Sequence, residues 1–206
     1  MVFVSEYRIL ALIIIIIFIN SKENDLRKIN KVSEITLKII GNGTQHIFKD
    51  SSKLPSKLQI NGNDVGTVGT YINIDNPNQN ESNITMIWNN DLTNCSNMFI
   101  DNSNITEIDL SQFDTSSVTT MAYMFYGQSK ITSLNLDNFD TTLVKSMYGM
   151  FSGCTKLTSL DLSNFNTALV TDFGLMFYGQ SNNIIILIRI IDIYISTYCS
   201  NIISIN

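Results

Sequence analysis

The residues that could support catalysis or metal binding are few and far apart. His46 is the single histidine, and it lies in a Gly/Thr-rich segment with no serine elbow, so a Ser-His-Asp hydrolase site is not indicated. The three cysteines, Cys95, Cys154 and Cys199, form no CxxC pair, which argues against a zinc site or a thioredoxin-type motif. We interpret them as small buried hydrophobic residues. We therefore expect no enzyme activity, no cofactor and no metal site.

A second set of polar residues alternates with apolar ones, as in Leu134-Asn135-Leu136. Successive side chains of a β-strand point to opposite faces, so the residues between the leucines face away from the core. Acidic and hydroxyl groups dominate this set, which suits a cationic or hydrogen-bonding protein ligand. The candidate ligand-binding residues are Glu107, Asp109, Ser111, Ser133, Asn135, Asp137, Ser159, Asp161 and Ser163.

Two other interpretations of these positions stand beside ligand binding. The side chains can serve only to keep the surface soluble, or stacked aspartates can bind calcium through their hard oxygen ligands. The calcium interpretation lacks the glycine-aspartate nonapeptide pattern that such ladders carry. Asp114, Asp140 and Thr115 are better explained as turn and cap residues.

The elements that position these residues repeat along the chain. The pair Met98-Phe99 recurs at Met124, Met150 and Met176, each 26 positions after the last. The same period relates three leucines, three phenylalanines, three threonines and three valines: Leu110, Leu136, Leu162; Phe113, Phe139, Phe165; Thr115, Thr141, Thr167; Val118, Val144, Val170.

Each unit has two halves with different periods. Residues 131–139 alternate around Leu134 and Leu136, which predicts a short strand. The second half begins at Asp140-Thr141, places Val144, Met147, Met150 and Phe151 at helical spacing and ends at Gly153. We therefore predict an α/β solenoid, a leucine-rich-repeat-like array of 26-residue strand-turn-short-helix units, because a lone unit could not bury both apolar faces.

The segment Leu157-Thr-Ser-Leu160-Asp-Leu162-Ser-Asn-Phe165 resembles the LxxLxLxxN strand of leucine-rich repeats. With Phe-Asp-Thr at 113–115 and Met-Phe-x-Gly at 124–127, the units resemble the BspA-like leucine-rich-repeat surface proteins of bacteria and protists, a repeat also known from mycoplasmal lipoproteins. The resemblance covers roughly Leu92 to Gln180, and Asn166 departs from it by replacing the aspartate of the other units. It implies extracellular display, attachment to host or neighbouring cells, no enzyme activity and ligand contact on the concave strand face.

The repeats are flanked by segments of other kinds. Residues 1–22 carry Arg8 before an apolar run and are predicted to be a signal peptide, with a retained signal-anchor or a buried helix as alternatives. Residues 32–90 read as a β-rich N-terminal cap region, in which SEITLKII alternates and Asn61-Gly62 favours a tight hairpin. The solenoid itself is expected at 91–181, as three full units and part of a fourth.

Residues 182–206 form an isoleucine-rich tail that loses the repeat motif. It reads as a cap, a membrane span or a frameshifted or intron-derived end, and Arg189 and Asp192 count against a span. Ile186 falls 26 positions after Leu160, so the first isoleucines can add one more strand.

The overall charge limits the choice of partner. The chain has 13 basic and 18 acidic residues and a net charge of -5, so nucleic acid is not an expected partner. We predict a non-enzymatic binding or adhesion protein, secreted or at the cell surface, that contacts a protein partner on a host or neighbouring cell. The alternative is a self-associating surface or matrix scaffold without a dedicated ligand site. Contact with a membrane is expected only through a retained N-terminal anchor or the C-terminal tail.

Overall fold

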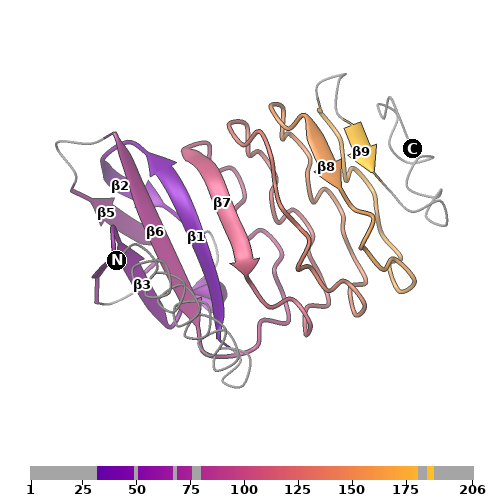
Figure 1. Cartoon of the computed structure of the whole chain (residues 1–206), viewed down its shortest axis with the longest axis horizontal. Coiled ribbons are helices and arrows are strands. Elements are labelled where there is room, and N and C mark those ends of the chain that lie inside the picture. The colour runs from indigo at the N-terminus through magenta and orange to yellow at the C-terminus, as the bar shows by residue number, and fades with distance from the viewer. Residues whose placement is uncertain (1–31, 49–50, 67–68, 76–79, 181–184, 188–206) are drawn as a thin grey trace, which may run out of the picture.

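The alternating segment SEITLKII forms an interior strand of the main sheet. A computed structural model of the chain describes residues 32–48, 51–66, 69–75, 80–180 and 185–187. Strand β1 (Ser33–Ile40) pairs antiparallel with β6 (Glu81–Trp88) on one side and with β7 (Ile105–Gln112) on the other. The sheet has five strands in the order β4-β3-β6-β1-β7, and Figure 1 shows it at one end of the molecule.

The two faces of β1 differ as the sequence predicts. Ile35, Leu37 and Ile39 are fully buried, whereas the residues between them are partly exposed. On the outer face Thr36 contacts Thr85 of β6 through their hydroxyl oxygens, 3.1 Å apart. The prediction of a half-buried strand is therefore confirmed here.

Asn61 and Gly62 form the predicted hairpin turn. Strand β3 (Lys57–Ile60) pairs antiparallel with β4 (Asn63–Asp64), and the two turn residues have φ values of 50° and 81°. These positive φ values are the conformation that an Asn-Gly pair adopts at low cost. Strand β3 also pairs with β6, which joins the hairpin to the main sheet.

A second, two-stranded sheet packs beside the first. It pairs β2 (Gly43–His46) with β5 (Tyr71–Ile74) in antiparallel fashion. The short 3₁₀ helix η1 (Ser51–Lys53) follows β2, and its Lys53 carbonyl accepts a hydrogen bond of 3.0 Å from the buried indole Nε1 of Trp88. Trp88, the last residue of β6, thereby links η1 to the main sheet.

The prediction of an α/β solenoid built from strand-turn-short-helix units is wrong. The fold is mostly antiparallel β-sheet, and η1 is the only helix in the described part of the chain. It lies outside the 26-residue units, whose second halves consist of successive turns instead of helices. The first halves are also less regular than predicted. Residues 131–139 form no strand, and β7 pairs with β1 of the preceding region and not with the next repeat unit.

The backbone of the second halves explains why no helix forms. Tyr123, Gly149 and Leu175 occupy one repeated position and have φ values of 56°, 61° and 55°. Four residues further along, Gly127 and Gly153 both have a φ of 74°. A right-handed helix requires negative φ at every residue, so each left-handed residue ends the helical path after one turn.

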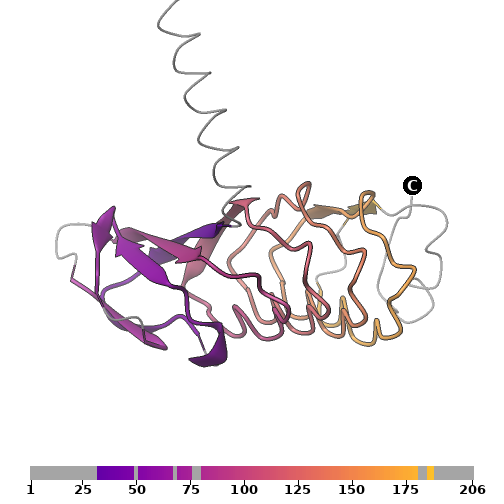
Figure 2. The same cartoon turned by 90° about the horizontal axis from the view of Figure 1, so that it is seen from below.

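Hydrogen bonds between neighbouring units replace those of a helix. The N–H groups of Phe99, Phe125 and Phe151 donate to the carbonyls of Met124, Met150 and Met176 at 3.0, 2.9 and 3.0 Å. Parallel bridges also connect Asn94 to Thr120, Thr120 to Ser146 and Ser146 to Asp172. Figure 2 shows the consecutive turns lying side by side along the long axis of the molecule.

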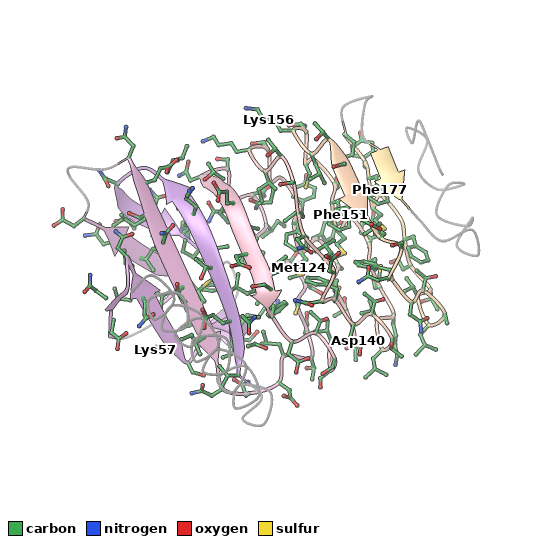
Figure 3. The ribbon with its side chains drawn as sticks, in the orientation of Figure 1. Lys57, Met124, Asp140, Phe151, Lys156 and Phe177 are labelled. Carbon is green, nitrogen blue, oxygen red and sulfur yellow. The ribbon has the colours of Figure 1, made fainter. Side chains whose placement is uncertain are left out.

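The repeated apolar residues form one core with the buried face of the sheet. Phe99, Phe125, Phe151 and Phe177 stack in a column with ring centroids 5.9, 5.6 and 5.6 Å apart. A second aromatic column follows the order Phe48, Trp88, Phe113, Phe139 and Phe165, with centroid distances of 6.1 to 6.3 Å. Figure 3 shows Met124, Phe151 and Phe177 inside the stacked units, with Asp140 and Lys156 toward opposite edges.

The repeat register continues past the last Met-Phe pair. Strand β8 (Ser159–Asp161) pairs in parallel with β9 (Ile185–Leu187), and Leu160 lies opposite Ile186. The predicted extra strand is therefore confirmed at these three residues. The predicted signal peptide at 1–22, and the rest of the tail at 182–206, lie outside the described residues.

Candidate functional site

All nine predicted ligand-binding residues are exposed, and they alternate with buried residues on what we call the strand face. They come from β7, from segment 133–137, which forms no strand, and from β8 with the two residues after it. Each of these segments contributes the same three positions of the unit: Glu107, Ser133 and Ser159; Asp109, Asn135 and Asp161; Ser111, Asp137 and Ser163. The structure thus brings the set together on consecutive units. The face is not lined by a continuous ladder of strands.

The middle position of each group has a structural task as well as exposure. Asp109, Asn135 and Asp161 each accept a hydrogen bond of 2.9 Å from the backbone N–H two residues later. These contacts fix a local turn of the kind that Asx side chains favour. Hydrogen bonds from the Ser163 hydroxyl and its N–H lower the pKa of Asp161. Each side chain is therefore held in place while its outer surface stays in solvent.

Glu107 is partly neutralised by the N-terminal region. Its carboxylate accepts a hydrogen bond of 2.7 Å from the Lys38 ammonium of β1, and Glu81 lies 4.0 Å from the same ammonium. The hydrogen bond to Glu107, and then its charge, raises the pKa of Lys38. Glu107 consequently offers less net negative charge to a ligand than its type indicates.

Two asparagines that we did not include among the site residues brace the strand face. Asn138 Nδ2 donates to the Ser111 carbonyl at 2.7 Å, and Asn164 Nδ2 donates to the carbonyls of Leu136 and Asp137, each at 3.0 Å. All three bonds reach back to the preceding unit. The signal that could have revealed them is their identical position, 26 residues apart, immediately before a repeated phenylalanine.

The interpretation of Asp114 and Asp140 as turn residues is confirmed. Each carboxylate accepts a hydrogen bond of 2.9 Å from the backbone N–H two residues later. Thr115 does more than we predicted: its buried hydroxyl donates to the Asp140 carbonyl at 3.1 Å and accepts from the Asp140 N–H at 2.8 Å. It therefore bridges two units.

Within the described ranges, no three His, Cys, Asp or Glu side chains lie close enough together to bind a metal ion. None of the helical residues that the structure describes forms a segment long and apolar enough to cross a membrane.

Cys95 and Cys154 are both buried free thiols, and burial raises the pKa of each to about 12.

The fold and the candidate site together define the class of protein: a β-sheet extended by stacked 26-residue units that carry an exposed polar face. Residues 75–184, just over half of the chain, match the family described as Mycoplasma protein of unknown function, DUF285, and the chain belongs to that family. The matched segment includes β6, β7 and β8. No curated protein and no solved structure is significantly similar to the chain. These comparisons do not confirm the finer resemblance to BspA-like proteins.

Proposed function

We propose that this protein is a non-enzymatic binding or adhesion protein, secreted or held at the cell surface, whose strand face contacts a protein partner on a host or neighbouring cell. The resemblance of its units to those of BspA-like surface proteins supports this proposed function. The observation that carries the proposal is the strand face itself, where nine exposed polar side chains lie on consecutive units.

Rigidity makes this face suitable for recognition. The turns at Asp109, Asn135 and Asp161 fix the local backbone, and the amides of Asn138 and Asn164 tie each unit to the one before it. A surface that is already ordered loses less conformational entropy when a partner binds. The strand face is therefore better prepared for binding than a flexible loop of the same composition.

Charge indicates the kind of partner. Asp109, Asp137 and Asp161 are exposed, whereas the carboxylate of Glu107 is already paired with Lys38. Like charges on one face raise the association rate of an oppositely charged partner and make binding depend on salt. A basic protein surface is the partner that this arrangement favours.

A self-associating scaffold is the alternative, and exposed apolar residues support it. Leu143 and Leu169 occupy one repeated position and are 45% and 49% exposed. They lie on the turn that follows the Asp-Thr or Asn-Thr pair of their units, at a different position in the unit from the strand face. Association between copies through these leucines would need no ligand site.

Three Asp→Asn substitutions separate the two functions. Asp109→Asn, Asp137→Asn and Asp161→Asn remove three charges, and Asn135 shows that asparagine can hold the same turn. We expect the triple variant to attach to cultured cells at least about tenfold less well than the parent at low salt, because lost charge steering slows association. Attachment is measured with labelled protein at low and high salt, and folding is checked by circular dichroism.

The matched control is Leu143→Ser with Leu169→Ser. Under the adhesion proposal this variant attaches to cells like the parent, whereas under the scaffold alternative it loses self-association in sedimentation velocity. Unchanged attachment of the folded triple Asp→Asn variant would rule out the strand face as the contact surface.

A further inference from the structure

A cleft of about 590 Å³ lies where the small β2–β5 sheet meets the turn that precedes β7. One wall carries His46 and Tyr71, and the other is the turn that contains Asp101 and Ser103. We call it the junction cleft. Its volume falls within the range of small-molecule sites in proteins.

Hydrogen bonds across the floor fix the two walls of the junction cleft. Asn102 Nδ2 donates to the His46 carbonyl at 2.7 Å, and Asn104 Nδ2 donates to Gln45 Oε1 at 2.8 Å. Asn102 is buried, so its bond is shielded from water. The cleft therefore has a set shape before any ligand arrives.

One wall presents an aromatic platform. His46 and Tyr71 are direct partners in the β2–β5 register, and their ring centroids are 3.6 Å apart. Tyr71 is nevertheless 55% exposed, which is more than most of the large apolar residues of the described chain. A ring held on one side by histidine and open on the other offers a flat apolar surface with a hydroxyl at its rim.

The opposite wall presents polar groups. Asp101 and Ser103 are exposed in the turn that precedes β7, and Asp101 has a φ of 53°, which Asp tolerates better than most residues. No lysine or arginine is found among the described residues that line the cleft. The described lining therefore offers no cationic partner to an anionic ligand, whereas the exposed carboxylate of Asp101 can accept hydrogen bonds from hydroxyl groups.

We propose that the junction cleft binds a sugar ring. A pyranose has an apolar face of C–H groups that can lie on the Tyr71 ring, and its rim of hydroxyls can donate to Asp101 and exchange hydrogen bonds with Ser103. The two walls supply these two kinds of contact on a fixed frame. The proposal does not depend on the protein partner of the strand face.

The test uses methyl glycosides of glucose, galactose, mannose and N-acetylglucosamine as probes, with saturation-transfer difference NMR on the full chain. At least one glycoside should receive saturation from the parent protein. Tyr71→Ala should weaken its affinity at least about tenfold, the equivalent of 1.4 kcal/mol, whereas Tyr71→Phe should keep most of it. Asp101→Asn should also weaken binding, and it should not disturb the backbone because asparagine tolerates the left-handed conformation at this position.

Tyr178→Ala is the matched control, because Tyr178 is 67% exposed but does not line the cleft. It should bind the glycoside like the parent. Since Tyr71 is itself largely exposed, its replacement should leave the melting temperature nearly unchanged. The proposal is overturned when no glycoside receives saturation, or when Tyr71→Ala and Tyr178→Ala bind equally well.

Discussion

Cys154 occupies a position where neighbouring units carry glutamine. Gln128 and Gln180 donate their side-chain amides to the carbonyls of Phe99 and Phe151 in the preceding units. The Cys154 thiol does the same for the Phe125 carbonyl, with a sulfur-to-oxygen distance of 3.1 Å. The common requirement at this position is thus a buried hydrogen-bond donor, which a purely apolar residue would not supply.

Burial of the two free thiols predicts low reactivity and a dependence of stability on pH. Burial raises the pKa of Cys95 and Cys154 to about 12 from an ordinary value of 9.0. Between these values the unfolded chain has lost the protons that the folded chain still holds, so stability falls as pH rises above about 9. Each thiol contributes a loss of about 1.4 kcal/mol per pH unit in that range.

A chain with Cys199→Ser allows both expectations to be measured. At pH 8 the folded protein should react with a thiol reagent far more slowly than the urea-unfolded protein, because thiolate is the reactive form. Adding Cys154→Ser should reduce the loss of unfolding free energy between pH 9 and pH 10.5. Fast labelling of the folded chain would mean that the thiols are accessible, contrary to their burial.

At the scale of the element, the turns that join the units depend on buried threonines. The Thr141 hydroxyl donates to the Asn166 carbonyl at 3.0 Å and accepts from the Asn166 N–H at 2.7 Å. Thr115 makes the same pair of bonds with Asp140. A single side chain therefore satisfies two backbone groups of the next unit.

Thr141→Val tests this bridge with little change in shape. We expect it to lower the free energy of unfolding by about 1–3 kcal/mol, because the backbone N–H and carbonyl of Asn166 lose their partner at a partly buried contact. Thr142→Val, at the adjacent exposed residue, should change stability by less than about 0.5 kcal/mol. Urea denaturation followed by circular dichroism measures both, and equal effects of the two substitutions would contradict the bridging role.

Some elements could be predicted from local sequence and others could not. The alternation of Ile35, Leu37 and Ile39 predicts β1, and Asn61-Gly62 predicts the β3–β4 hairpin, because both signals act over a few residues. The helix was wrongly predicted because turns that repeat every three or four residues place Val144, Met147 and Met150 inward just as a helix does. Gly149 was the contrary signal: its φ is 61°, and a Cβ there would lie 2.6 Å from the Tyr123 ring.

At the scale of the whole molecule, contacts between distant segments set the limit of prediction. Exposure of the strand-face residues follows from alternation with leucine, but Lys38 reaches Glu107 only because β1 pairs with β7. The junction cleft likewise combines His46, Tyr71 and Asp101 from three separate segments. The pattern of a single sequence does not show which distant segments pair, so neither the Lys38–Glu107 ion pair nor the junction cleft could be predicted.

Because neighbouring units share one register, a whole unit should be removable. Deleting residues 124–149 joins Tyr123 to Met150, which then takes the place of Met124 in the same ladder. We expect this variant to unfold cooperatively at a lower temperature than the parent, since one interface between units is lost. Deleting residues 124–147 joins Tyr123 to Tyr148 and moves the buried residues out of phase, so it should show no cooperative transition. Similar melting of both variants would show that register does not matter.

The hydrogen bonds between units join turns that follow one another along the long axis of the molecule (Figure 2). Tension between the two ends of the stacked units therefore pulls each bond open in turn, and does not load many bonds at once in shear. A unit that yields releases 26 residues of chain, which extend by roughly 90 Å when drawn out. Under load the protein would lengthen in steps and keep its remaining units folded, as an extensible tether does.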